Sequence, residues 1–182
     1  MKKTIDGQHE FVQIIKKSRF ITNIKNVSSE KEAKLFVQAI SNKYHDARHN
    51  VFAYVVEGKE KYHDAGEPKG TAGVPLHTLL QQKHLDHIVV VVSRYFGGIK
   101  LGSGGLIRAY RGGLLNALDQ VDIIDIEEII SKDIPVTMEN RSKIENYLRS
   151  IPNISLEILE DKILVKGKKK NIEEIKYEKI YN

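Results

Sequence analysis

A glycine-rich segment with spaced cations is the part of the sequence best suited to bind a ligand. Residues 89–110 read VVVVSRYFGGIKLGSGGLIRAY, and seven of the 13 glycines lie between positions 97 and 113. Glycine permits backbone angles closed to other residues and lets a ligand approach the main chain. Residues 94–111 contain no acid but hold four cations: Arg94, Lys100, Arg108 and Arg111. The pattern predicts a site for a phosphate or phosphodiester group.

The glycine-rich segment leads into a helix that we expect over residues 106–118. Ser103 is a suitable N-cap, which would leave the next three amides free, and the helix dipole then favours an anion. The alternative is that the glycines only pack helix against sheet and the charges only face water. The predicted phosphate-binding residues are Arg94, Gly97, Gly98, Lys100, Gly102, Ser103, Gly104, Gly105 and Arg108, joined by Lys17 and Arg19 from a neighbouring strand region.

These glycines fit none of the common nucleotide or nucleophile motifs. A P-loop needs Lys before Ser or Thr after its second glycine, but Ser103 follows Gly102 directly. A dinucleotide-binding fingerprint needs a third glycine where Ile107 stands. A nucleophile elbow needs glycine two residues before the serine, where Leu101 stands. An ordinary nucleotidase or esterase is therefore disfavoured.

A second candidate is the polar loop over residues 63–75, HDAGEPKGTAGVP. Its three glycines imply tight turns, and such a loop beside a helix N-terminus is a common place for function. Glu67 has three possible roles: to bind a cation, to pair with Arg94 or to act as a base. The alternative is that Glu67 and Thr71 only hydrogen-bond the loop to itself. The possible functional residues here are Asp64, Glu67, Thr71 and His49.

The chain offers no evident metal or cofactor site. It has no cysteine, which excludes thiolate catalysis and cysteine-based zinc sites. His45, Asp46 and His49 have nearly helical ligand spacing, but His49 is expected to begin a strand and no HExxH motif is present. We therefore predict no bound metal and no cofactor. The lysine run at 168–170 is expected to be a solvated turn, or an addition to a phosphate surface.

The order of expected elements predicts two domains of mixed α and β structure, over 1–130 and 131–182. In the first domain we expect strands at 11–15, 19–24, 49–56 and 87–95, and a partly alternating last strand within 121–130. A loop is expected at 57–73. One helix should start at a capping box formed by Ser29 and Glu32, a second should run from Pro75 to about Lys83, and a third should cover 106–118. The second has the order β-α-β-β-α, with strands at 134–138, 154–159 and 162–165 and helices ending at 148 and starting at 172. This order is typical of a small ferredoxin-like domain.

Net charge and hydropathy indicate which partners and which compartment to expect. The net charge of +5 permits nucleic-acid binding without demanding it. The N-terminal MKKTIDGQHEF lacks the apolar region of a secretory signal, and the longest apolar run, 88–92, is far shorter than the about 20 residues of a membrane span. We expect a cytoplasmic globular protein with no membrane partner.

Several stretches resemble one family, the IMPACT family, in its bacterial two-domain, YigZ-like type. They are KSRFI at 17–21, His49-Asn50, GEPKGTAG at 66–73, RYFGGIKLG at 94–102 and RAY at 108–110, within a match over about 8–120. The resemblance implies an α+β or α/β chain whose first domain is similar to domain 2 of ribosomal protein S5 and to domain four of elongation factor G. It implies a second, ferredoxin-like domain similar to domain five of that factor. Bacterial-type members have Asp-Asp where this chain has Asp64-Ala65.

The same resemblance implies contact with RNA or with the ribosome and its translation factors. Eukaryotic members regulate translation initiation in the response to starvation stress. We therefore predict a non-catalytic cytosolic protein that regulates translation by binding RNA or ribosome-associated components at its glycine-rich basic surface. One alternative is a regulator that binds a protein partner through Tyr95 and Phe96 without touching RNA. Another is an uncharacterised hydrolase with Glu67 or Asp64 as base. The oligomeric state stays open.

Overall fold

The chain is an α+β protein that divides into two compact units, Met1–Ile126 and Glu127–Asn182. The computed structural model describes residues 2–176. The second unit begins with strand β8 (Ile129–Pro135), so this strand starts before the boundary at 131 that the sequence suggested.

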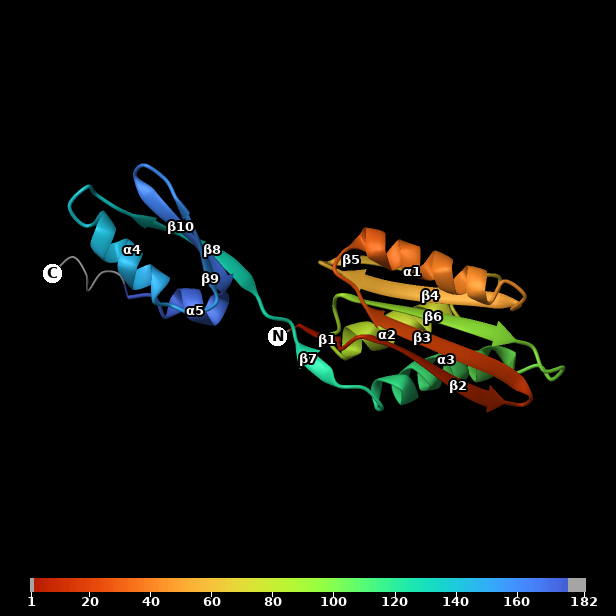
Figure 1. The fold of residues 1–182 in the computed structure, drawn as a ribbon. Helices are drawn as coiled ribbons and strands as arrows, with labels where there is room; N and C mark the ends of the chain where they lie inside the picture. The colour runs from red at the N-terminus through yellow and green to blue at the C-terminus, as the bar shows by residue number, and fades with distance from the viewer. Residues whose placement is uncertain (1, 177–182) are drawn as a thin grey trace. The chain divides into compact units, whose positions relative to one another are not determined.

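The first unit is built on a five-stranded antiparallel sheet of order β2-β3-β6-β4-β5 (Figure 1). The strands are β2 (Gln8–Ile15), β3 (Ser18–Asn26), β4 (His49–Val56), β5 (Lys59–His63) and β6 (Ile88–Tyr95). The central strand, β6, is buried on both faces. Successive side chains of a strand point to opposite faces, so its four consecutive valines supply both faces of the core. This confirms the buried strand predicted from the apolar run.

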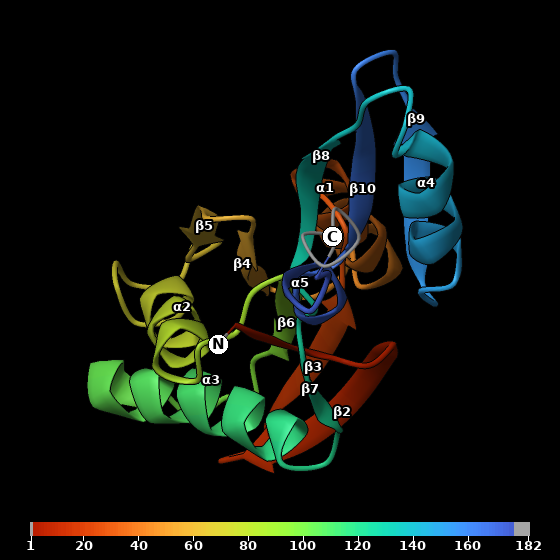
Figure 2. The same ribbon diagram turned by 90° about the vertical axis from the view of Figure 1, so that its left-hand side faces the viewer.

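Helices cover both faces of this sheet. On one face, α1 (Glu30–Lys43) packs against Val89 and Val91 of β6. On the other face, α2 (Gly73–Gln82) and α3 (Gly102–Leu118) lie side by side and pack against alternate residues of the same strand (Figure 2). The sheet is therefore the middle of three layers.

The predicted capping box of α1 is confirmed in one of its two bonds. Ser29 Oγ accepts from the amide of Glu32 at 3.2 Å. The return bond is shifted by one residue, because the Glu32 carboxylate accepts from the amide and hydroxyl of Ser28. Hydrogen bonds from Lys25 and then from Ser28 lower the pKa of Glu32 to about 2. The N-terminus of α1 is thus capped by a charged carboxylate.

The expected loop over residues 57–73 is wrong in part, because it contains β5, which forms a hairpin with β4. All five residues of β5, KEKYH, are exposed, so no alternation of apolar and polar residues announces the strand. The last strand expected within 121–130 is split. Its first part is β7 (Ile123–Asp125), which pairs with β1 (Lys3–Ile5), and its end belongs to β8 of the second unit.

The second unit has the predicted element order, β8-α4-β9-β10-α5. Its antiparallel sheet has the order β8-β10-β9, with β9 at Ile154–Ile158 and β10 at Lys162–Lys168. The helices α4 (Arg141–Arg149) and α5 (Lys169–Glu173) share a core with the sheet that includes Ile134, Ile144, Leu148, Ile163, Val165 and Ile172. The helix expected from 172 onward begins at Lys169, and its expected continuation beyond 176 lies outside the described residues.

A close backbone approach joins two loops at one end of the first unit. Lys16 and Lys17, both with positive φ, form the tight turn between β2 and β3. The amide of Gly97 donates to Ser18 Oγ at 3.2 Å, and a Cβ at position 97 would lie 2.0 Å from the carbonyl carbon of Lys17. Only glycine fits here without moving backbone, so Gly97 fixes the β6–α3 loop on this turn.

Gly97→Ala is therefore expected to destabilise the first unit by about 3 kcal/mol or more, because the clash is with main chain and not with a side chain that moves aside. Urea unfolding followed by circular dichroism measures this. The matched control is Gly112→Ala within α3, where nothing lies within 4 Å of the new methyl group. It should stabilise by about 0.5–1 kcal/mol through helix propensity. Equal effects of the two substitutions would contradict the close approach.

Candidate functional site

Three strands place side chains in one row at the end of the sheet where β3 and β4 begin and β6 ends. Arg94 of β6 lies directly between Phe20 of β3 and His49 of β4. Residues directly opposite one another in antiparallel strands share a face. This is the face that α2 and α3 cover, so Arg94 is only 5% exposed. The predicted surface cation is a buried one.

The loop before α2 is held in shape by Asp64. Its carboxylate accepts hydrogen bonds from three main-chain amides, those of Gly70, Ala72 and Gly73. Ala72, the N-cap of α2, offers no side-chain acceptor, so Asp64 caps this helix from a distance. Thr71 Oγ1 donates to the carbonyl of Pro68, as the structural alternative for this residue predicted. Asp64 and Thr71 thus position the loop.

This loop carries Glu67 into the space beside Arg94. The Glu67 side chain is 3% exposed, and its Oε1 accepts from Arg94 Nη1 and from the hydroxyl of Tyr110, each at 2.7 Å. Burial, and then the nearby Glu67 charge, raise the pKa of Tyr110, so its hydroxyl stays a donor. A buried charge is stable only when it is paired and hydrogen-bonded, and the two side chains supply each other's counter-charge, although Arg94 Nε is buried with no hydrogen-bond partner among the described residues. Of the three roles that the sequence left open for Glu67, the structure shows the pairing with Arg94.

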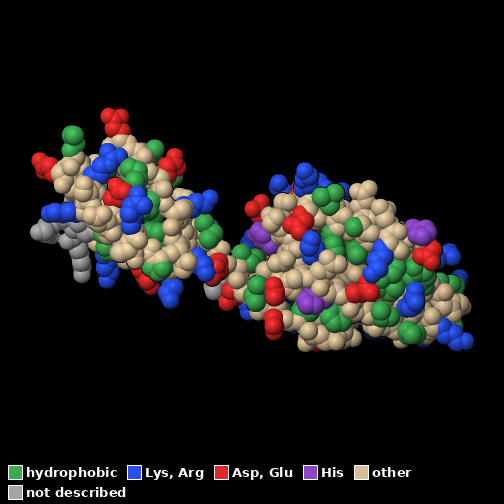
Figure 3. Space-filling model, in the orientation of Figure 1, with side chains coloured by type: hydrophobic (Ala, Val, Ile, Leu, Met, Phe, Trp, Pro, Cys, Tyr) green, Lys and Arg blue, Asp and Glu red, His purple; other side chains and the backbone are tan. Residues whose placement is uncertain are grey.

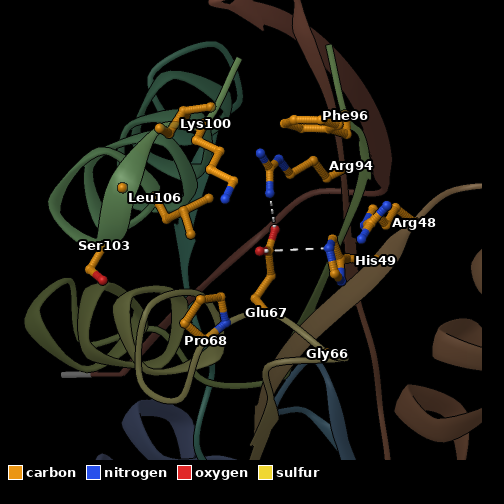
Figure 4. A pocket seen from close by; sticks show the side chains of 12 residues that line it. Arg48, His49, Gly66, Glu67, Pro68, Arg94, Phe96, Lys100, Ser103 and Leu106 are labelled. Atoms are coloured by element: carbon orange, nitrogen blue, oxygen red, sulfur yellow. Dashed lines mark hydrogen bonds and ion pairs between the residues drawn. The ribbon is translucent and has the colours of Figure 1, made fainter. Parts of the chain in front are cut away.

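The second oxygen of Glu67 is left without a hydrogen bond within residues 2–176. Its nearest polar neighbour is His49 Nε2, at 3.7 Å. The other ring nitrogen, Nδ1, lies 2.8 Å from the carbonyl oxygen of Ala65. A carbonyl only accepts, so Nδ1 is the donor, and in the neutral imidazole Nε2 is an acceptor. Figure 4 shows this imidazole facing the Glu67 carboxylate across the dashed line. With the ring neutral, two acceptors face each other there.

Around these two acceptors lies a pocket of about 440 Å³. Phe96 lines it above Arg94, and Lys100 extends into the same space from the side opposite His49 (Figure 4). Arg48, Lys100 and Arg94 contribute three positive charges to the lining and Glu67 contributes one negative charge. With neutral histidine the pocket is net positive, which favours an anionic ligand.

The start of α3 lines one side of the pocket. The prediction that Ser103 is its N-cap is wrong. The helix begins at Gly102, its N-cap residue is Leu101, and no side chain caps it, so Ser103 lies inside the first turn. The free amides of the first turn are those of Gly102, Ser103 and Gly104, rather than those of residues 104–106. The glycines disfavour helix by propensity, which suggested a later start, but packing against the sheet overrides this preference.

The structure brings together some predicted site residues and leaves others outside. Those lining the pocket are His49, Glu67, Arg94, Lys100, Gly102 and Ser103. Not among the lining residues are Lys17, Arg19, Gly97, Gly98, Gly104, Gly105 and Arg108. Arg19 shares the other face of the sheet with Tyr95, on whose ring it stacks at 4.5 Å.

Sequence reasoning gave no place in the site to Arg48, Tyr110 or Phe96, although it proposed Phe96 for a protein interface. The available signal was adjacency, because Arg48 directly precedes His49 and Phe96 follows Arg94 by two residues. Tyr110 lies eight residues into α3, and its contact with Glu67 depends on how that helix crosses the sheet.

The described part of the chain contains neither a cluster of metal ligands nor a membrane-spanning helix. No group of three or more His, Asp or Glu side chains there is arranged to hold a metal ion. None of its helices combines the length and apolar character needed to cross a bilayer.

Glu67→Ala is expected to lower the free energy of unfolding by about 3–5 kcal/mol, because it leaves the Arg94 guanidinium buried without its counter-charge. Adding Arg94→Met to this variant should restore part of the lost free energy of unfolding, because the unpaired buried charge is then removed. Urea denaturation measures all variants.

The control is Glu10→Ala. Glu10 has the same kinds of partner, a lysine and a tyrosine hydroxyl, but lies exposed on β2. It should cost about 1 kcal/mol or less. A loss in Glu67→Ala no larger than in this control would show that the buried pair does not hold the site.

The chain matches proteins of one family. The model of the Impact N-terminal domain matches residues 16–118. A Bacillus subtilis protein, IMPACT family member YvyE, is 42% identical over 146 residues, which cover 79% of this chain and 66% of that protein. The Escherichia coli protein IMPACT family member YigZ is 43% identical over 115 residues, covering 60% of this chain and 56% of that protein. The aligned part thus spans less than two thirds of the length of these relatives.

A solved structure agrees with these sequence matches. The crystal structure of a hypothetical protein superposes with a TM-score of 0.70 at 31% identity, covering 92% of this chain and 86% of that chain. The family model alone accounts for more than half of the chain, and it includes both the Glu67 loop and the start of α3. The chain belongs to the IMPACT family.

Proposed function

We propose that this protein binds RNA, without catalysis, through phosphate contacts around the pocket, and that it acts in this way on translation. The observation that carries the proposal is a group of cations at the pocket end of the first unit. Lys16, Lys17, Arg48, Lys69, Lys100 and Arg108 are exposed, and none forms an ion pair within residues 2–176.

The distribution of charge supports this choice of surface. Lysine and arginine side chains gather among hydrophobic ones at the right-hand end of the first unit in Figure 3. Elsewhere on this unit five lysines are paired with acids, namely Lys2, Lys25, Lys34, Lys43 and Lys59, and four exposed ones are in no ion pair among the described residues, namely Lys3, Lys31, Lys61 and Lys83. Cations that neutralise phosphates release the counterions condensed on the nucleic acid, which is the main source of affinity for it.

The β2–β3 turn gives independent support. Lys16 and Lys17 have φ of 45° and 65°, in the left-handed region that Asn and Gly adopt at lower cost. Each lysine costs on the order of 1 kcal/mol there. Strain retained at an exposed turn is common at functional sites, and the property that lysine adds here is charge.

The first turn of α3 adds uncharged phosphate ligands beside these cations. The amides of Gly102, Ser103 and Gly104 lack intrahelical acceptors, and all three residues are exposed. Arg108 folds back toward this turn, with Nη1 3.5 Å from where a Cβ of Gly104 would stand. Amides and a guanidinium at one helix N-terminus suit a phosphate.

The cations of the second unit are partly paired. Lys162, Lys168 and Lys169 are paired with Asp133, Glu127 and Glu128 respectively, whereas Lys143, Lys166, Lys170 and Lys176 are exposed and in no ion pair within residues 2–176. The sequence had suggested that this unit extends the binding surface, and in our proposal the first unit carries most of it.

The bonding of Asp64 disfavours this residue as the base of a hydrolase. Its carboxylate accepts three main-chain amides, and a proton-abstracting role would disrupt the loop that these bonds shape. Glu67 uses one oxygen to hold Arg94 and Tyr110 in place. The other oxygen, Oε2, takes no part in these bonds, so ester hydrolysis by the wild type that is lost in Glu67→Gln would support the hydrolase alternative.

The test is a titration of fluorescent single-stranded RNA and of tRNA with the pure protein at several salt concentrations. Wild-type affinity should fall linearly in a log–log plot against salt. In Arg48→Ala/Lys100→Ala the slope should drop by about 1.5–2, because two phosphate contacts are lost. Arg94 is left intact, since its buried pairing makes it unsuitable as a surface probe.

Lys31→Ala/Lys61→Ala is the control, because these exposed lysines lie on α1 and β5 and the net charge changes equally. It should bind as the wild type does. The absence of RNA binding at low salt would overturn the proposal, and capture of a partner that survives nuclease treatment would then favour the protein-binding alternative through Phe96.

A further inference from the structure

The pocket contains an unsatisfied hydrogen-bonding position that phosphate contacts do not explain. Glu67 Oε2 has no hydrogen bond within the described residues and, with the rest of this residue, lines the pocket. His49 Nε2 faces it at 3.7 Å and is itself an acceptor in the neutral ring, because Nδ1 donates to Ala65. Both residues line the pocket, so a ligand that brings hydrogen-bond donors can reach both atoms.

The group that fits must offer two donors side by side, one for each acceptor. A single hydroxyl has one proton, and satisfies only one of them. An ammonium has enough protons, but Arg48, Arg94 and Lys100 already make the pocket net positive. A vicinal diol is neutral, has two hydroxyl donors on adjacent carbons and can meet both acceptors.

The rest of the pocket fits the other parts of a nucleotide. Phe96 is 44% exposed, and the guanidinium groups of Arg48 and Arg94 lie 6.0 and 5.7 Å from its ring. An exposed aromatic ring beside arginines is a stacking platform for a base. Lys100 and the free amides at the start of α3 lie across the pocket, where they suit a phosphate. A volume of about 440 Å³ is in the range of small-molecule sites.

We infer that this pocket binds a ribonucleotide whose 2′,3′-diol is free, with the two hydroxyls donating to Glu67 and His49 and the base stacked on Phe96. Such a diol occurs at the 3′ end of an RNA and in a free mononucleotide. The RNA source rests on the proposed function, whereas the free nucleotide does not. In either case the carboxylate distinguishes ribose from deoxyribose through the hydroxyl protons.

The test compares RNA oligomers that carry a 5′ fluorophore and differ only at the last sugar: unmodified, 2′-deoxy or 3′-deoxy. All three have the same charge and bases. The deoxy forms should bind about tenfold more weakly or worse, because each lacks one of the two hydroxyl donors that meet Glu67 and His49. Equal affinities would overturn the inference and leave the proposed RNA binding intact.

Two variants locate the effect. Phe96→Ala, at an exposed side chain, should weaken all three oligomers by a similar factor. Glu67→Gln should shrink the difference between the unmodified and deoxy ends, with circular dichroism confirming that the variant is folded. Glu10→Gln is the matched control and should keep the full difference. Unchanged discrimination in a folded Glu67→Gln variant would overturn the assignment of the diol to this carboxylate.

A second arm separates the two sources. Adenosine and cytidine monophosphates, and their 2′,3′-dideoxy forms, are titrated by calorimetry. If RNA fails to bind at low salt but the monophosphates bind and their dideoxy forms do not, the pocket is a free-nucleotide site and only the proposed function falls. If neither RNA nor monophosphates bind, both proposals are overturned.

Discussion

The buried ion pair between Glu67 and Arg94 is the interaction on which the pocket depends. It joins the loop before α2 to the central strand of the sheet, and the Tyr110 hydroxyl ties α3 to the same carboxylate oxygen. Neither charge is stable in this interior without the other, so the three elements must meet in one arrangement. The pair leaves Oε2 of Glu67 without a hydrogen bond among the described residues, and this oxygen faces a pocket whose other charged side chains are cations.

The surrounding backbone is arranged to keep that geometry. Asp64 accepts three main-chain amides, and these bonds shape the Glu67 loop and cap α2. Gly97 lets the β6–α3 loop lie directly on the β2–β3 turn, and so positions the cations of both loops at one end of the unit. The pocket therefore combines a fixed acceptor inside with exposed positive charge outside. This combination suits an anionic ligand that also has hydroxyl protons to donate.

Much of this fold follows from sequence patterns, and the parts that do not have physical reasons. The valine run predicted the central strand because a strand buried on both faces needs no polar residue. β5 was missed because it lies at a sheet edge with every side chain exposed. The start of α3 was placed too late because glycine propensity argued against a helix that packing stabilises. The possible pairing of Glu67 with Arg94 was visible in the charges, but the burial of Arg94 and the facing acceptor of His49 depend on strand register, which composition does not give.

The most direct measurement of the central claim is an NMR titration of the ¹⁵N-labelled protein with a short RNA that has a free 3′ end. If Glu67 and the start of α3 form the binding site, the largest amide shift changes will fall on Gly66, Glu67 and residues 102–104, with those of α1 unaffected. Shift changes confined to α1 or to the described strands of the second unit, with the pocket amides unmoved, would contradict the account.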